Sequence, residues 1–217
     1  MFFVEEEGTQ SSFQGINDVV NDYGVFASLY TDRGSHYWHT PEAGGKVDKG
    51  NLTQFGRAMR QLGIEMIPAY SPEARGRSER AFRTHQERLV KELAVTGITD
   101  MKKANEYIRN IYLPAFNDEF FVPPEEAASM FVSWAGTTVE DILCEHYERT
   151  VGNDNCVRFD GLALQIPQDQ YRYHYVRVKV RIHRYPNGNL AIFYGHRKLA
   201  TYNSQGKEVV ISDKKAA

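Results

Sequence analysis

The fold is decided by residues 25–32, VFASLYTD. Residues 25–30 form a short apolar run that is partly β-branched and aromatic, which predicts a buried strand of an α/β sheet. Asp32 follows this strand directly. Functional groups of open α/β sheets commonly lie beyond the carboxyl ends of the strands. We therefore expect an α/β fold in which Asp32 lies at the carboxyl edge of the sheet, where functional residues gather.

The segments around this strand complete an α/β unit. Apolar residues at helical spacing predict helices at residues 13–23 and 52–62, and Asn51 is expected to cap the second one. Residues 64–69 indicate another short buried strand. Residues 39–50 contain several glycines and a proline without apolar periodicity, which predicts a long loop.

A second polar segment follows, YSPEARGRSER at residues 70–80. It begins with a predicted turn and continues into a long helix over residues 78–93, with Phe82, Leu89 and Leu93 expected to face the core. In the first turn of this helix the dipole favours the Glu79 carboxylate. Carboxylate oxygens hold divalent ions in phosphoryl-transfer sites. We therefore interpret Asp32 and Glu79 as candidate metal ligands. The alternative is that the first caps a turn and the second only complements the helix dipole.

Two further helices are predicted before the character of the chain changes. They cover residues 100–112, where Pro114 is expected to stop the helix, and residues 138–149. Between them, Pro123-Pro124 indicates the start of a linker.

The C-terminal part predicts β-structure with a basic surface. Residues 176–182 alternate between β-branched and basic side chains, which predicts a half-buried strand, and Asn187-Gly188 predicts a hairpin turn. About five such strands would form a small antiparallel barrel or sandwich. Residues 171–207 contain eight Lys and Arg and no Asp or Glu, so this region can bind a polyanion although the net charge of the 217-residue chain is −2.

Both acidic segments resemble those of a known family. Residues 30–37, YTDRGSHY, are similar to the Asp-x-Gly-x-x-Tyr/Phe segment that carries the second catalytic acid of DDE transposases and retroviral-type integrases. Residues 70–80 are similar to the segment that carries the third acid, through Tyr70-Ser71-Pro72, Gly76 and Glu79-Arg80. The resemblance extends over essentially the whole chain and points in particular to transposases of bacterial insertion sequences.

The resemblance implies a fold in three parts. Residues 1–122 are expected to form a ribonuclease H-like integrase core that lacks its first strands, residues 123–150 a helical linker, and residues 151–217 an SH3-like basic β-barrel that binds DNA. The family's first catalytic Asp lies on a strand that precedes the segment resembling residues 2–7. We therefore expect a C-terminal fragment with impaired catalysis.

The resemblance also implies a function in DNA integration. It implies phosphodiester cleavage and strand transfer that depend on Mg²⁺ or Mn²⁺, with Asp32 and Glu79 as the catalytic metal ligands. The implied partner is double-stranded DNA of transposon ends and target, and the chain is expected to be a homo-oligomer in the bacterial cytoplasm, associated with the nucleoid. Two alternatives stay open: a non-catalytic DNA-binding or transposase-interacting module, and a relic that folds poorly.

The candidate DNA contacts are cations near the two motifs. They are Arg75, Arg77, Arg80 and Arg83 around Glu79, and Arg177, Lys179 and Arg181 on the C-terminal strand. Such cations neutralise phosphates without reading the base sequence. The alternative for both sets is an ordinary solvated surface.

Membrane insertion and metal binding through cysteine are not indicated. No apolar run approaches the roughly 20 residues that span a bilayer. Cys144 and Cys156 follow no metal-type spacing, so we expect both to be reduced thiols that are buried or half-buried.

Overall fold

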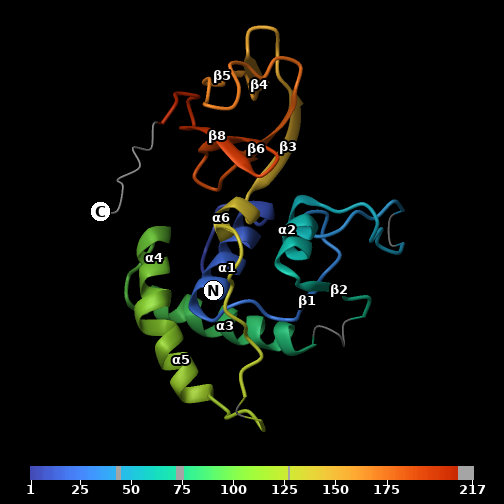
Figure 1. The fold of residues 1–217 in the computed structure, drawn as a ribbon. Helices are drawn as coiled ribbons and strands as arrows, with labels where there is room; N and C mark the ends of the chain where they lie inside the picture. Colours follow the sequence, from blue (N-terminus) through green and yellow to red (C-terminus); the bar gives the residue numbers. More distant parts are fainter. Residues whose placement is uncertain (43–44, 72–75, 127, 210–217) are drawn as a thin grey trace. The chain divides into compact units, whose positions relative to one another are not determined.

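The computed structural model describes residues 1–42, 45–71, 76–126 and 128–209. The chain divides into two compact units, Met1–Trp134 and Ala135–Ala217 (Figure 1). Within the described ranges, no helix is both long enough and apolar enough to cross a membrane.

In the N-terminal unit, the helix before each of the two strands packs against the other helix through aromatic rings. Helix α1 covers Thr9–Asp22 and helix α2 covers Gln54–Leu62. The rings of Phe13 and Phe55 stack between them, with centroids 6.0 Å apart. Thr53 caps α2 by accepting a hydrogen bond from the Gly56 N–H (3.0 Å), whereas the predicted cap, Asn51, donates its own N–H to Asp48 in the preceding turn.

The predicted parallel strands are present but are less buried than expected. Strand β1 (Ser28–Thr31) pairs in parallel with β2 (Glu65–Pro68), with Thr31 opposite Pro68. Only these two facing residues are buried in the pair, and Tyr30 is 59% exposed. Among the described residues no third strand pairs with this sheet, so the outer edge of each strand has no strand partner.

In the same unit, a long helix packs against a continuous run of three helical segments. Helix α3 (Gly76–Val95) buries Leu89 against Ile108 and Tyr112. The partner consists of α4 (Met101–Tyr107), a π-helical turn η2 (Ile108–Tyr112) and α5 (Leu113–Phe120).

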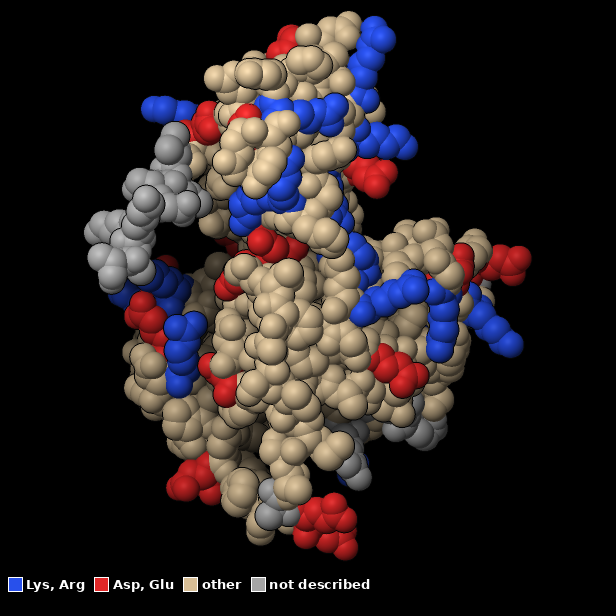
Figure 2. All heavy atoms as spheres, viewed as in Figure 1, with Lys and Arg blue, Asp and Glu red and all other residues tan. Residues whose placement is uncertain are grey.

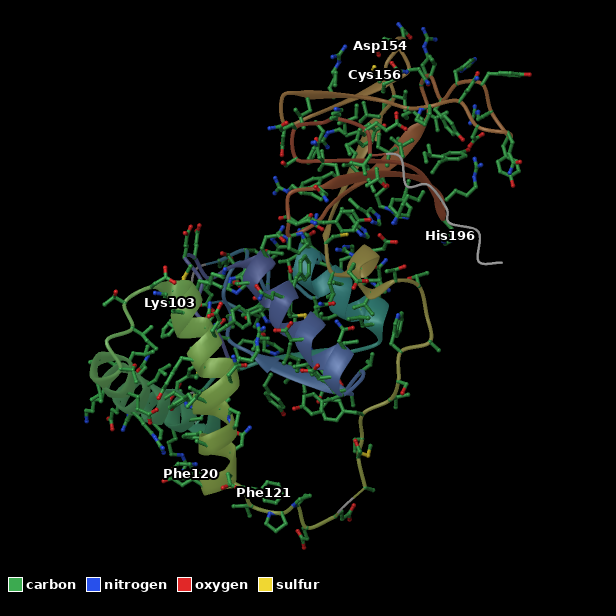
Figure 3. All side chains as sticks on the ribbon, turned by 90° about the vertical axis from the view of Figure 1, so that its left-hand side faces the viewer. Lys103, Phe120, Phe121, Asp154, Cys156 and His196 are labelled. Carbon is green, nitrogen blue, oxygen red and sulfur yellow. The ribbon has the colours of Figure 1, made fainter. Side chains whose placement is uncertain are left out.

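Two expectations for these helices are wrong. Phe82, predicted to face the core, is 55% exposed. Pro114 does not end the helical segment, because it lies in the first turn of α5, where a missing N–H costs no hydrogen bond. The π-helical turn before it lets the chain continue. Helix α5 ends at the exposed Phe120, and the exposed Phe121 begins an extended segment (Figure 3).

The C-terminal unit is an antiparallel β-structure. A four-stranded sheet has the order β3-β6-β7-β8, and β4 and β5 form a separate hairpin. The bounds are Glu145–Thr150 for β3, Cys156–Phe159 for β4, Leu162–Gln165 for β5, Lys179–Arg184 for β6, Leu190–Tyr194 for β7 and Arg197–Tyr202 for β8. Buried aliphatic and aromatic residues from the sheet and the hairpin share one core.

The helix predicted at residues 138–149 is wrong beyond Ile142, and the helical character predicted for the linker at residues 123–150 is wrong for its described residues outside α6. Only α6 (Val139–Ile142) is helical, and β3 follows it as a strand of the sheet. Pairing with β6 sets Glu145 opposite Arg184 and Glu148 opposite Arg181. Opposite charges across a strand pair stabilise it, and such tertiary contacts override local helix propensity.

Candidate functional site

The carboxyl ends of β1 and β2 bring the two acidic segments to one edge of the sheet. The Ala69 N–H donates to the Thr31 carbonyl oxygen at 2.9 Å, so the chains that leave the two strands run side by side. The Arg33 guanidinium lies 5.2 Å from the Tyr70 ring centroid, over its face. This cation–π contact joins the residue after Asp32 to the residue that opens the second motif.

Asp32 is half-buried and is oriented by its own loop. Its Oδ1 accepts a hydrogen bond from the Gly34 N–H at 2.9 Å, which forms an Asx turn. A Cβ at Gly34 would lie only 3.0 Å from the same oxygen. The glycine of the Asp-x-Gly segment therefore lets the backbone approach the carboxylate closely.

A buried hydrogen bond fixes this loop to the sheet. The Trp38 indole N–H donates to Thr31 Oγ1 at 2.8 Å, and both side chains are buried. The Thr53 hydroxyl, which also caps α2, donates to the Tyr37 carbonyl oxygen at 3.0 Å. The loop after Asp32 is thus held at both the strand and the neighbouring helix.

Glu79 lies in the first turn of α3, as predicted, and is exposed. Its neighbour Ser78 and the loop residue Tyr37 line a common groove of about 610 Å³, which α1 completes through Ser12. The start of α3 and the loop after Asp32 therefore face the same hollow. The residues that connect β2 to α3, at positions 72–75, lie outside the described part of the chain.

The structure describes the side chains of two of the four cations predicted around Glu79. Arg80 and Arg83 are exposed on α3, and the Arg80 Nε–H donates to the Gly76 carbonyl oxygen at 3.1 Å. Arg75 and the side chain of Arg77 lie outside the described residues. Arg88, further along the same helix, is engaged in ion pairs with Glu92 (2.7 Å) and Glu119 (2.6 Å).

The predicted basic strand is shorter than the alternation suggested. Arg177 has a φ of 60° and precedes β6 in a turn, so it is not on the strand, although it is exposed. Lys179 is exposed on β6, and Arg181 is half-buried with its guanidinium donating to the Gly195 carbonyl oxygen at 3.1 Å. The core side of this strand, Val180 and Ile182, is buried as predicted.

Several cations of the acid-free stretch pair with acids from outside it. Arg184 contacts Glu145 at 2.6 Å and Asp160 at 3.0 Å. Two further ion pairs are Arg197 with Asp169 (3.0 Å) and Lys198 with Asp141 (3.2 Å). Figure 2 accordingly shows Asp and Glu side chains among the Lys and Arg of this unit. The positive surface is therefore smaller than the sequence count indicates.

An aromatic and cationic cluster that includes Tyr171, Tyr175 and Arg197 lies beside these pairs. The buried Tyr175 donates its hydroxyl to Asp169 at 2.6 Å, and this hydrogen bond lowers the pKa of the Asp169 carboxyl. Burial raises the pKa of Tyr175 itself. The Arg197 guanidinium lies 4.5 Å from the ring centroid of Tyr171, which is 69% exposed. Alternating tyrosines in a basic segment were the available signal.

Comparison with known proteins finds relatives among transposases. The chain is 28% identical over 197 residues to the "Putative transposase y4bF" of Sinorhizobium fredii, which covers 89% of this chain and 42% of that protein. It is 27% identical over 170 residues to the "Transposase for insertion sequence IS1202" of Streptococcus pneumoniae, which covers 78% of this chain and 36% of that protein. The chain thus spans less than half the length of these two relatives.

Two other comparisons add little. No protein-family model matches the chain. A chain in the cryo-EM structure of the simian T-cell lymphotropic virus intasome in complex with PP2A regulatory subunit B56 gamma superposes with a TM-score of 0.41 at 12% identity, over 96% of this chain and 66% of that one. A score of this size does not establish a common fold.

Proposed function

Since this chain is related over most of its length to insertion-sequence transposases, we propose that it acts in DNA transposition. The observation that carries the proposal is the sheet edge at which Asp32 follows β1 and Tyr70 follows β2, with Arg33 stacked on Tyr70 between them. Functional groups of open α/β sheets lie at such an edge. We further propose that the N-terminal unit is part of a ribonuclease H-like integrase core and that the C-terminal unit is an SH3-like barrel.

Asp32 and Glu79 are the proposed ligands of a divalent ion, Mg²⁺ or Mn²⁺. Both offer hard carboxylate oxygens, which these ions prefer, and neither side chain is fully buried. The Asx turn with Gly34 fixes one oxygen of Asp32 and so limits the rotation of its carboxylate. A bound ion would supply Lewis-acid activation of water or a hydroxyl group for attack on a phosphodiester. Further oxygen ligands are needed for a two-metal site, so we expect catalysis by these two carboxylates alone to be weak.

Double-stranded DNA is the proposed partner, bound as transposon end or target, with the chain acting as a homo-oligomer at the bacterial nucleoid. Support comes from the exposed Arg80 and Arg83 next to Glu79, and from the exposed Arg177 and Lys179 in the other unit. Cations in these positions neutralise backbone phosphates. Arg75, Arg77 and Arg181 also belong to the proposed set of DNA contacts. The Arg181 guanidinium already donates a hydrogen bond to the Gly195 carbonyl oxygen.

Metal binding tests the first half of this proposal. Titration of the full chain with Mn²⁺ by calorimetry should show a site that Asp32→Asn and Glu79→Gln each weaken by about tenfold or more, because each removes a charged ligand oxygen. Asp18→Asn on α1 and Glu87→Gln on α3 replace exposed acids outside the site and should leave the affinity unchanged. Equal affinity for all five proteins would overturn the assignment of Asp32 and Glu79.

A second candidate function is DNA binding without catalysis. It is favoured by the location of Arg177 and Lys179 in a unit separate from the acidic motifs. Electrophoretic shift of duplex DNA decides between the two functions. A binding module keeps its affinity in Asp32→Ala and Glu79→Ala and loses it when Arg177, Lys179 and Arg181 are changed to Gln. Cleavage or joining of plasmid DNA with Mn²⁺ that Asp32→Ala abolishes would establish the catalytic function instead.

A further inference from the structure

A cysteine and two histidines meet at one end of the C-terminal sheet. One ligand atom from each of Cys144, His146 and His183 lies within 4.8 Å of the others, and the cysteine and His183 are buried. Among the described residues, this is the cluster of three potential metal-ligating side chains that lie close enough together to hold one ion. It involves neither Asp32 nor Glu79 and does not depend on the proposed function.

The strand register produces this cluster. His146 on β3 lies directly opposite His183 on β6, so both side chains project from the same face of the sheet. Cys144 precedes His146 by two residues, which is the spacing that returns a side chain to that face. The pattern was not recognised in the sequence because residues 138–149 predict a helix, in which residues two apart point in different directions.

His183 is buried at this end of the sheet, although the sequence predicted a basic face exposed to solvent. The alternation of residues 176–183 placed His183 on the solvent side, yet it is 3% exposed. Its ring stacks on His146, with centroids 3.8 Å apart and planes at 13°, and on Phe193, at 4.0 Å and 22°. Two imidazoles and a thiol are thus gathered in a partly desolvated position, where polar groups require compensating interactions.

The hydrogen bonds of the cluster prepare His146 to act as a ligand. Its Nε2 lies 2.9 Å from the Asp141 carbonyl oxygen, which can only accept, so this nitrogen carries the proton. Nδ1 would then be the nitrogen of His146 that coordinates a metal ion. A histidine that donates its other N–H to a backbone carbonyl is the usual arrangement around protein-bound metals.

We propose that Cys144, His146 and His183 form a binding site for a thiolate- and imidazole-preferring divalent ion, of which Zn²⁺ is the type. Zn–S and Zn–N distances of about 2.3 and 2.0–2.1 Å set the ligand atoms of a tetrahedral site roughly 3.4–3.6 Å apart. Coordination would therefore require the ligand atoms to draw together by up to about 1.4 Å and the stacked rings to tilt away from each other. The thiol proton is released to solvent, and water completes the coordination.

The nearby charges are compatible with a cation. Lys198 lies close to the cluster, with its ammonium 5.3 Å from the Phe193 ring centroid, but Asp141 forms an ion pair with it at 3.2 Å. The same carboxylate accepts a hydrogen bond from the Tyr185 hydroxyl. Asp141 therefore balances the lysine and holds α6 in place, while its carbonyl oxygen orients His146.

The ion would connect three elements of the unit. Cys144 follows α6, His146 is on β3 and His183 is on β6, so coordination ties the chain at its entry into the unit to the second strand of the sheet. Binding to the folded state alone raises the midpoint of thermal unfolding. The site would therefore stabilise the folded unit, and its ligands are distinct from those of the divalent ion proposed at Asp32 and Glu79.

Cobalt substitution tests the site. The reduced, chelator-treated full chain should bind one equivalent of Co²⁺ with the thiolate-to-metal charge-transfer absorption of a cysteine ligand. Zn²⁺ should displace the Co²⁺ and raise the unfolding midpoint. Cys144→Ser should abolish the charge-transfer band. Cys156→Ser should keep it, since Cys156 lies beside Asp154 on β4, at the other end of the unit from α6 (Figure 1, Figure 3).

A second variant keeps the test decisive if Cys144→Ser does not fold, as judged by far-UV circular dichroism. His146→Gln changes the least buried member of the cluster and should weaken Co²⁺ binding by about 100-fold or more, since loss of even an outer-shell partner costs roughly 10- to 100-fold. The proposal is overturned if no stoichiometric Co²⁺ binding occurs, or if a folded Cys144→Ser or His146→Gln protein binds Co²⁺ as the unchanged chain does.

Discussion

The parallel pair β1-β2 and the four-stranded sheet β3-β6-β7-β8 are ordered by different means. In β7 four of five residues are buried, and the sheet around it encloses a continuous apolar core. In β1 one residue of four is buried, and the loop that follows is held by hydrogen bonds from Trp38 to Thr31 and from Gly34 to Asp32. The C-terminal unit therefore gains its stability from burial, whereas the proposed acidic site depends on a few directional contacts at a sheet edge.

The sharpest test of this contrast is truncation of one side chain in each sheet. Ile192→Ala on β7 removes a fully buried side chain and should lower the free energy of unfolding by about 2–5 kcal/mol. Leu29→Ala on β1 removes a half-buried side chain and should cost about half as much or less. Urea unfolding combined with amide hydrogen exchange of the two strands measures both. Equal losses would remove the distinction.

The hydrogen bond between Trp38 and Thr31 should have the next largest effect. Trp38→Phe leaves the buried Thr31 hydroxyl without its donor and should cost about 1–3 kcal/mol. The same change should weaken Mn²⁺ binding, because the loop that orients Asp32 loses its attachment to β1. Thr31→Val removes the other partner, and a double-mutant cycle isolates the bond. Additive effects of the two changes would show that the bond does not organise the loop.

A smaller effect is expected at the end of α2. Gly63 has a φ of 75°, which L-residues other than glycine adopt at a cost, so Gly63→Ala should lose about 1 kcal/mol. Gly76→Ala at the start of α3 is the matched control, since a Cβ meets no atom within 4 Å at either position and Gly76 is not among the residues with positive φ. The control should be neutral or stabilising in thermal unfolding. A loss of the same size at Gly76 would contradict the conformational explanation.

The smallest effect is a pH dependence of the C-terminal unit. Asp169 has a pKa lowered in the folded state by the hydrogen bond from Tyr175. Its contribution to stability is therefore complete above the unfolded pKa of about 3.9 and is lost as the pH falls through the lower folded value. Asp169→Asn should flatten the acid side of the stability curve. An unchanged curve would mean that other carboxyl groups dominate acid unfolding.

The sequence predicted the elements that have strong local signals. Both parallel strands, the helix that carries Glu79 and five of the C-terminal strands, β4 to β8, lie where the periodicity indicated. It failed at β3, because Ile142, Leu143 and Tyr147 repeat at helical spacing, and the pairing with β6 that decides the structure is remote in sequence. The Pro114 prediction failed because a proline tolerated in a first turn cannot be told from one that stops a helix without the neighbouring geometry.

The candidate site was predictable in part. The order of strand and motif placed Asp32 and the start of the second motif at one sheet edge, and the register of β1 and β2 agrees with this. The contact of Arg33 with Tyr70 could not be anticipated, because it joins residues that only the parallel pairing brings together. The ion pairs of Arg184, Arg197 and Lys198 were likewise hidden, since their acids come from other segments of the chain.

Those three ion pairs set an upper limit on how steeply DNA binding can depend on salt. Each phosphate contact on duplex DNA releases about 0.9 counterion, so the slope of log K against log salt counts the contacts. If all eight Lys and Arg between Tyr171 and Lys207 touched phosphate, this stretch would contribute a slope of about −7. With three of them paired within the protein, its contribution should not exceed about −4.5 in magnitude. The internal pairing therefore makes residues 171–207 a weaker polyelectrolyte than their composition implies, so the proposed DNA binding should weaken less steeply as salt rises.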